Sequence, residues 1–346
     1  MTRLLPALLM GGALLAASAF NPVPASAAEP PTPEVAYGLT FDAAGLFASP
    51  AGKLLMDRVR QQEPRLDEWV AGLTDSLGLD VTTDLGVVSL TSDRDDLSDL
   101  TLMADLGETS GKLEGWMLTL PGYDSEDLDD QTLLHGFDVE LDGASADDGT
   151  LRSVQEDGTG QPHPRRTVRV FAAVPQTRGG RFCLVASTTR AQTLAMAGDV
   201  AADRNPLAKT TERLPGDRLL SLSVGRLPTK LLEDTADQPG AAAWRAVRGL
   251  QIDVASGERF RTDVAVAAST AARGRQLKQL LGGLGAVVQL MASGDNNAAV
   301  GEAAGILSEL SLDDRADGEP GVEIGLDIPQ SRLEGWVDRG LIPAMR

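Results

Sequence analysis

The chain has 346 residues, of which 42% are hydrophobic, and its formal net charge at neutral pH is −19. The hydrophobic content is enough to form packed cores, so it excludes a wholly disordered chain, and the length favours two domains over a single core. The negative charge repels phosphate backbones and anionic lipid head groups, and it therefore disfavours binding to nucleic acid and adhesion to anionic membranes.

The N-terminal residues have the composition of a secretory signal peptide. They begin with one positive charge, and the stretch that follows, up to Phe20, is uncharged and rich in leucine and alanine. Ala25-Ser26-Ala27 then places small side chains where a signal peptidase requires them, and Ala17-Ser18-Ala19 offers a second such site. We predict a signal peptide over residues 1–27, cleaved after its last alanine, and therefore a periplasmic or secreted protein.

A proline-rich spacer over residues 28–34 leads into a first predicted α+β lobe, which spans residues 35–202. This lobe opens with an alternating segment, 35–41, that predicts a strand. Ser49 and Pro50 then predict the start of a helix, because the serine hydroxyl can cap free backbone N–H groups and proline fits the first helical position.

A second helix of this lobe is predicted to have one apolar face and to end at Gly78. Its apolar residues recur at helical spacing, at Leu66, Trp69, Val70, Leu73 and Leu77. Residues 142–164 are polar and rich in aspartate and glycine, which indicates a long loop or a hairpin tip. The other patterns predict strands at 87–90, 100–104 and 116–120, a short helix at 125–134, a hairpin of 168–174 with 182–187, and a helix at 189–201.

A segment with Pro206 and Pro215, residues 203–216, is predicted to link the first lobe to a second lobe over residues 217–346. The order of its elements is β-α-β-β-α-β with an added helix, which belongs to the split βαβ or ferredoxin-like class. We therefore predict an α+β protein with two lobes of antiparallel sheet packed with helices. The patterns of the second lobe predict strands at 219–224, 250–254, 260–267 and 322–328 and helices at 228–233, 241–247, 271–292, 295–310 and 332–337.

Several segments carry a likeness to a known group of proteins. They are the helix start Ser49-Pro50-Ala51-Gly52-Lys53-Leu54-Leu55, the strand Arg181-Phe182-Cys183-Leu184-Val185-Ala186-Ser187, the strand Val264-Ala265-Val266-Ala267 and the turn Asp317-Gly318. In these segments and in the order of its elements, the chain resembles a group of uncharacterised exported bacterial proteins with two α+β lobes. The resemblance covers most of residues 35–340, and it implies the fold but no active site.

The rare reactive side chains give little support to catalysis. Cys183 is the sole cysteine, so no intrachain disulfide is available, and its apolar neighbours predict a buried strand residue. The two histidines, His135 and His163, lack the close spacing that zinc sites need, and we predict that the first is partly buried and the second solvated. The sequence contains no nucleophile elbow and no phosphate-binding loop. We therefore assign no catalytic, cofactor-binding or metal-binding residue and no cofactor.

Carboxylates are the abundant reactive groups, and they gather in three clusters. Calcium takes six to eight oxygen ligands, but none of the clusters fits the EF-hand pattern, so we favour solvated turns over calcium sites. A carboxylate pair for glycoside hydrolysis, made of acids far apart in the sequence, stays open. The clusters are Asp93, Asp95, Asp96 and Asp99, then Asp124, Glu126, Asp127, Asp129 and Asp130, then Asp142, Asp147 and Asp148.

A local group of arginines lies on the predicted hairpin of the first lobe. We expect these side chains to balance nearby acids at 142–157 rather than to hold an acidic partner, since surface ion pairs are common and weak. The group consists of Arg165, Arg166, Arg169, Arg178 and Arg181.

The sequence thus favours a non-catalytic binding or assembly module whose partner is an envelope or secreted protein. It does not give the ligand, the partner or the oligomeric state. One alternative is a carboxylate-dependent hydrolase that acts on saccharide or cell-wall material, and the other is a module stabilised by calcium.

Overall fold

The computed structural model describes residues 37–62, 65–94, 99–128, 132–142, 165–202, 204, 218–225, 247–294, 305–306, 308–315 and 318–338. The predicted signal peptide, the proline-rich spacer and His163 lie outside these residues, as do the predicted helices at 228–233 and 241–247 and most of the predicted linker. In the described part of the chain, no helix is long and apolar enough to cross a membrane.

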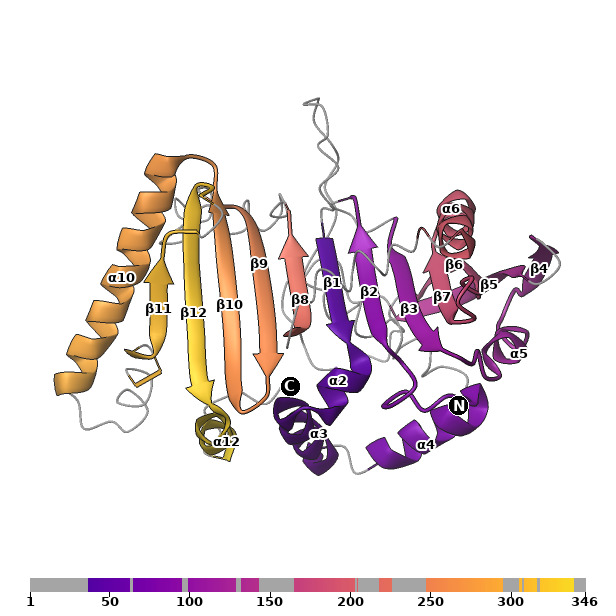
Figure 1. Cartoon of the computed structure of the whole chain (residues 1–346), viewed down its shortest axis with the longest axis horizontal. Helices are drawn as coiled ribbons and strands as arrows, with labels where there is room; N and C mark the ends of the chain where they lie inside the picture. The colour runs from indigo at the N-terminus through magenta and orange to yellow at the C-terminus, as the bar shows by residue number, and fades with distance from the viewer. Residues whose placement is uncertain are drawn as a thin grey trace, which may run out of the picture.

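The described strands form one 12-stranded sheet in the order β11-β12-β10-β9-β8-β1-β2-β3-β7-β6-β5-β4, and every neighbouring pair is antiparallel (Figure 1). The predicted α+β class with an antiparallel sheet is therefore confirmed. The strands before residue 202 are β1 (Tyr37–Asp42), β2 (Val87–Ser92), β3 (Thr101–Gly107), β4 (Asp124–Asp127), β5 (Leu133–Asp142), β6 (Arg165–Ala173) and β7 (Phe182–Ser187).

The remaining strands occupy the other half of the sheet. They are β8 (Arg218–Val224), β9 (Val247–Ser256), β10 (Arg259–Ala268), β11 (Leu310–Asp313) and β12 (Gly321–Pro329). The two halves meet where β1 pairs with β8, with Leu39 opposite Leu222 and Thr40 opposite Ser221. One hydrogen-bonded sheet therefore runs through both predicted lobes.

The ferredoxin-like order predicted for the second lobe is wrong. A split βαβ unit places a strand between two others that are parallel to each other, whereas β8, β9 and β10 lie side by side in chain order and are antiparallel. The sequence predicted four of the five strands of this half and missed β11. Hydrogen-bonded neighbours are set by contacts between distant residues, and the order of elements alone does not fix them.

The described helices are short except for α10, which packs against β12 and β10 near one end of the sheet, while α3, α4 and α12 lie along one end of the strands (Figure 1). Their bounds confirm the predicted helices near 50, 66–77, 189–201, 271–292 and 332–337. They are α2 (Ala43–Ala48), α3 (Pro50–Gln62), α4 (Leu66–Leu77), α5 (Leu113–Met117), α6 (Arg190–Ala201), α10 (Ala271–Gly294) and α12 (Gln330–Asp338).

Two of these helices have the ends that the sequence predicted. Ser49 Oγ accepts a hydrogen bond from Gly52 N at 2.9 Å, which satisfies a free N–H group at the start of α3. Gly78 ends α4 with φ 65°, in the left-handed region that favours glycine. The sequence therefore predicted the start of α3 and the end of α4 correctly.

Two predicted elements between residues 113 and 134 are wrong. The segment 116–120, predicted as a strand, overlaps α5, and Leu113, Met117 and Leu120 are buried at helical spacing. The segment 125–134, predicted as a helix, contains most of β4 and the start of β5, which pair with each other. The apolar run at 116–120 resembled a strand in sequence. At 125–134, pairing between strands outweighed the local preference of an acidic segment for helix.

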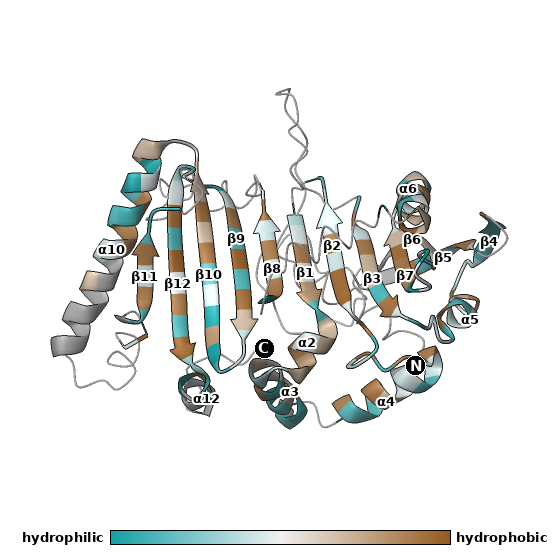
Figure 2. Cartoon of the chain, viewed as in Figure 1, coloured by the Kyte–Doolittle hydropathy of each residue, from teal (hydrophilic) through white to brown (hydrophobic). Residues whose placement is uncertain are grey.

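The two faces of the sheet differ in polarity, and Figure 2 shows the alternation along β9, β10 and β12. The apolar face carries Leu39, Leu222, Ile252 and Val264, which are consecutive cross-strand neighbours. On it, α4 and α5 cover the core of the first half, whereas α10 and α12 cover β10 and β12. The polar face is the opposite one, and α6 packs there against β3, β6 and β7.

Candidate functional site

Two members of the predicted arginine group, Arg169 and Arg181, pair with acids inside the molecule. The acids at 142–157 that were predicted as partners lie almost entirely outside the described residues, while Arg165 and Arg166 have no described side chain. The ion pairs of this region join Arg169 to Asp124 at 2.6 Å and to Asp138 at 3.1 Å, Arg181 to Asp105 at 2.5 Å, and Arg190 to Glu126 at 2.6 Å. The acids that these arginines balance belong to β3, β4 and β5, and not to the predicted segment.

The predicted carboxylate clusters do not form a metal site in the described part of the chain. Asp99 accepts hydrogen bonds from Ser92 Oγ at 2.5 Å and from Asp93 N at 3.2 Å, and it thereby closes the turn between β2 and β3. Among the described residues, no group of three or more His, Cys, Asp or Glu side chains is placed to hold a metal ion. The other acids of these clusters that lie outside the described residues are Asp95, Asp96, Asp129, Asp130, Asp147 and Asp148.

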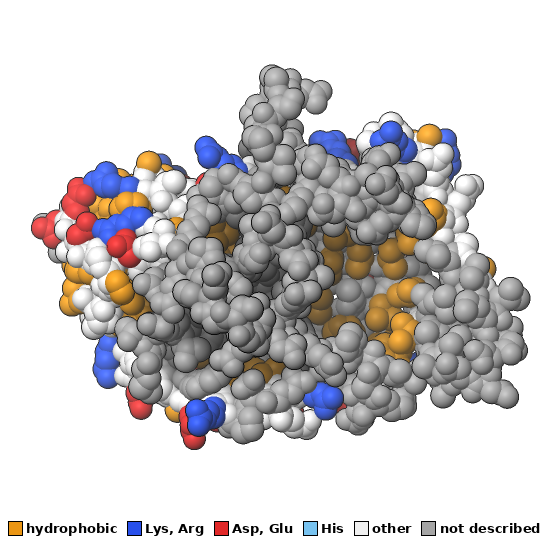
Figure 3. Space-filling model, turned by 180° about the vertical axis from the view of Figure 1, so that it is seen from behind, with side chains coloured by type: hydrophobic (Ala, Val, Ile, Leu, Met, Phe, Trp, Pro, Cys, Tyr) orange, Lys and Arg blue, Asp and Glu red, His pale blue; other side chains and the backbone are white. Residues whose placement is uncertain are grey.

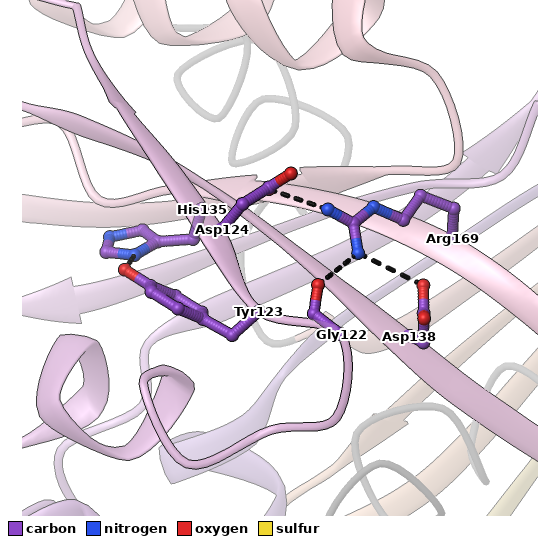
Figure 4. A network of polar contacts seen from close by, with 6 residues as sticks. All are labelled: Gly122, Tyr123, Asp124, His135, Asp138 and Arg169. Carbon is purple, nitrogen blue, oxygen red and sulfur yellow. Dashed lines mark hydrogen bonds and ion pairs between the residues drawn. The ribbon is translucent and has the colours of Figure 1, made fainter.

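His135 is completely buried, with 0% of its surface exposed, rather than partly buried as predicted. Its Nδ1 lies 3.1 Å from the Tyr123 hydroxyl (Figure 4), and its Nε2 lies 3.4 Å from Glu114 Oε1. A neutral ring satisfies both contacts when Nδ1 accepts the phenolic proton and Nε2–H faces the carboxylate. Nucleophilic triads use the same order of acid, imidazole and hydroxyl, but complete burial of this ring indicates a structural role.

Arg169 holds the segment beside this histidine (Figure 4). Its guanidinium reaches from β6 to Asp124, to Asp138 and to the carbonyl oxygen of Gly122, so it ties β4 and the turn before it to β5. Gly136 leaves room for this group, because a Cβ there would overlap Asp124 Oδ1 and Arg169 Nη2. These polar contacts form a clamp that fixes the edge of the sheet.

The Cys183 thiol is a core group, as the sequence predicted. Only 2% of the residue is exposed, and it packs on the polar face among Met103, Val185 and Ala197. Burial raises the pKa of this thiol to about 12, and the nearby Asp105 carboxylate adds to the effect. The thiol is therefore protonated at physiological pH, which leaves little of the nucleophilic thiolate.

A row of small polar side chains crosses the middle of the polar face. Ser89, Thr40 and Ser221 are cross-strand neighbours on β2, β1 and β8, and the Thr40 and Ser89 hydroxyls lie 3.3 Å apart. Asp253 and Asp263 continue the row on β9 and β10. Residues from both halves of the sheet thus contribute to one polar line at the β1–β8 junction.

The two acids of this row face each other in the register of β9 and β10. Asp253 is 7% exposed, and its Oδ2 accepts a hydrogen bond from Gln251 Nε2 at 3.0 Å and lies 3.3 Å from Arg218 Nη1. Burial raises the pKa of Asp263, Glu323 and Asp253 reinforce the increase, and Arg261 and Arg218 oppose it. Chemically, such a pair can exchange a proton or bind a cationic group.

On the apolar face of the same strands, a group of hydrophobic side chains is only half-buried. None of the core clusters formed by described residues contains them. Figure 3 views this side of the molecule and shows hydrophobic side chains lining a hollow. The half-buried group, which we call the apolar strip, consists of Leu39, Leu220, Leu222, Leu250, Ile252, Val254 and Val264.

Sequence reasoning missed both the acid pair and the apolar strip. Asp253 and Asp263 are lone acids in predicted strands, whereas the acids that form clusters in the sequence lie in predicted loops and in a predicted short helix. A lone acid in the middle of a strand was the signal that could have found them. That the two acids are opposite each other depends on strand register, which the sequence did not give.

No protein family matches the sequence, and no curated protein matches it significantly. Two crystal forms of TP0453, forms III and IV, are similar in structure over 88% of this chain and over 95% and 93% of theirs, with 9% sequence identity and a TM-score of 0.40. A likeness at this level assigns the chain to no family and gives it no function.

Proposed function

We propose that this protein is an exported, non-catalytic binding or assembly module, and that an apolar segment of an envelope or secreted protein docks on the apolar strip. The half-burial of the strip is the observation that supports this docking site. A half-buried apolar surface still contacts water, and covering it with an apolar partner is favourable at roughly 25 cal/mol per Å². The framing helices α10 and α12 would set the position of such a partner.

The proposed location rests on the N-terminal sequence. A signal peptide over residues 1–27, cleaved after Ala27, would place residues 28–346 in the periplasm or outside the cell. A net charge of −19 favours a soluble acidic protein that meets its partner through a local apolar area.

We also propose that the predicted lobes, 35–202 and 217–346, correspond to the two halves of the sheet. Strands β1 to β7 lie on one side of the β1–β8 junction and strands β8 to β12 lie on the other, without interleaving. Such a division supports a boundary in the predicted linker at 203–216.

The test is affinity capture of tagged residues 28–346 from native envelope and secreted fractions, followed by affinity measurement with the purified partner. Ile252→Glu places a charge in the middle of the strip, and we expect it to weaken binding at least about tenfold, because desolvating an unpaired charge in an interface is costly. Ser311→Glu, on the exposed polar face of β11, is the matched control and should bind as the wild type does.

The outcomes separate the parts of this proposal. A partner that binds wild type and Ile252→Glu equally would exclude the strip as the docking site while keeping a binding role. Failure to capture any stoichiometric partner would argue against assembly. Circular dichroism and thermal unfolding of each variant establish that a loss of binding does not reflect misfolding.

The acid pair favours a second candidate function, a carboxylate-dependent hydrolase that acts on saccharide or cell-wall material. Hydrolysis by this route needs one carboxylic acid and one carboxylate close together, and the raised pKa of Asp263 beside Asp253 fits these roles. Purified residues 28–346 would then release reducing ends from cell-wall glycans, and Asp263→Asn would abolish the release. Equal rates for wild type and Asp263→Asn would reject this function.

A further inference from the structure

The register of β9 and β10 creates an electrostatic problem at Asp253 and Asp263. Side chains of directly opposed residues in an antiparallel pair have Cβ atoms about 4.5–5.5 Å apart, and like charges at such positions are destabilising. The preceding and following pairs, Ile252 with Val264 and Val254 with Thr262, carry no charge. The acids of the two strands are therefore directly opposite each other, between uncharged pairs.

One oxygen of this pair lacks a hydrogen-bond donor. Asp253 Oδ2 is satisfied by Gln251 and Arg218, but Asp253 Oδ1 is buried and has no hydrogen-bond partner among the described residues. Leaving a buried acceptor without a donor costs about 1–3 kcal/mol, and more for a charged group. The arrangement therefore calls for a donor at this oxygen.

The charges around Asp263 do not supply that donor. Arg218 faces it from β8 but is engaged at Asp253 Oδ2, while Arg261 is on β10 itself, with Nε 4.0 Å from Asp327 Oδ2. Glu323 on β12 adds a third negative charge. Asp253 across the strand pair and Glu323 on β12 thus both favour the protonated form of Asp263.

We propose that Asp253 and Asp263 share one proton, carried by Asp263 and donated to Asp253 Oδ1, and that its release acts as a pH-sensitive switch in the second half of the sheet. With the proton bound, the carboxyl group of Asp263 is a hydrogen-bond donor and the repulsion across β9 and β10 disappears. Without it, two carboxylates face each other at the centre of these strands. The direction of the Asp263 pKa, which burial raises, agrees with this assignment.

The effect on stability has a defined sign. A carboxyl group whose pKa is higher in the folded than in the unfolded protein binds the proton more tightly when folded. The stabilisation that this proton gives is therefore fully present below the unfolded value of 3.8, and it is lost as the pH rises from there through the folded pKa. Because Ile252 and Val264 alternate with these acids, loosening of this strand pair would also disturb the apolar strip.

The experiment compares the pH dependence of unfolding by denaturant in wild type, Asp263→Asn and Asp313→Asn. Asparagine keeps the shape of the protonated acid and offers an amide donor to Asp253 Oδ1 at every pH. We expect the free energy of unfolding of the wild type to fall relative to that of Asp263→Asn as the pH rises above 3.8. The slopes of the two free energies against pH should differ by an amount that approaches one proton per molecule. Asp313→Asn, at an exposed position on β11, should parallel the wild type.

Carboxyl-carbon NMR of the wild type gives an independent answer that does not require a folded variant. The expected result is a midpoint for Asp263 above 3.8, together with a chemical-shift step at Asp253 over the same pH range. A midpoint for Asp263 at or below 3.8, or an Asp263→Asn profile parallel to the wild type, would overturn the proposal. Neither readout depends on a partner, so the docking proposal stands or falls separately.

Discussion

Gly136 shows how a single residue permits the clamp at the edge of the sheet. It lies on β5 beneath the guanidinium of Arg169. The ion pair between Arg169 and Asp124 occupies the space that a side chain at this position would need. Tyr123, next to Asp124, contacts the buried His135 on the opposite face of β5. Adjacent side chains therefore fix the β4 segment to both faces of its neighbouring strand.

We predict that Gly136→Ala lowers the free energy of unfolding by about 1–3 kcal/mol, because the added methyl group displaces Arg169 from Asp124. Gly198→Ala in α6 is the control, since a Cβ there meets no atom within 4 Å. It should raise stability by about 0.5–1 kcal/mol through better helix propensity. Denaturant unfolding measures both, and equal effects of the two substitutions would contradict the clamp.

The Cys183 thiol gives a second prediction. Its pKa of about 12 and its burial between β7 and α6 should make it unreactive toward an aromatic disulfide reagent at pH 8 in the native protein. Complete labelling should follow denaturation. Rapid labelling of one thiol per native molecule would show that this part of the core opens readily.

The sequence predicted some of these residues and not others. Burial of Cys183 followed from its apolar neighbours within one strand, and the cap at Ser49 followed from local chemistry. The acid pair and the Arg169 clamp depend on which strands are neighbours and in which register. Such contacts join residues far apart in the chain, so no local pattern encodes them.

Among the elements, α3 illustrates how a cap connects to tertiary structure. Ser49 Oγ accepts a hydrogen bond from Gly52 N, and the N–H group of Ala51, one residue earlier, donates to Ser256 Oγ on β9 at 3.1 Å. The start of α3 is thus joined both to its own cap and to the second half of the sheet.

We expect Ser49→Ala to lower the free energy of unfolding by about 1 kcal/mol, the usual value for a lost N-cap. The matched control is Ser76→Ala in α4, where the exposed hydroxyl donates to Gly72 O within the helix, and we expect no loss there. Thermal unfolding of the two variants distinguishes the cap from a general effect of removing a serine hydroxyl.

The elements predicted wrongly lie where pairing outweighs local preference. β4 consists of Asp-Ser-Glu-Asp, which has poor strand propensity, yet it pairs with β5 and is held by Arg169 and Arg190. By contrast, α10 was predicted accurately because its apolar residues recur at helical spacing over many turns.

At the scale of the whole molecule, β1 and β8 join the two halves through a run of paired residues from Tyr37 with Val224 to Phe41 with Leu220. Separating the halves would break this ladder in the middle of the sheet. We therefore predict a single cooperative unfolding transition, with equal calorimetric and van't Hoff enthalpies. Two resolved transitions in scanning calorimetry would show that the predicted lobes unfold independently.

The strands at the two ends of the sheet, β4 and β11, have four residues each, and both end in aspartate. A long sheet is a template for growth, because its last strand offers hydrogen-bonding groups to any extended chain nearby. Strands this short offer few backbone hydrogen-bonding groups to another chain. Two copies that met at β4 would also bring their carboxylates together. Brevity and negative charge thus oppose the extension of one molecule's sheet into the next, and they favour a discrete particle over a fibre.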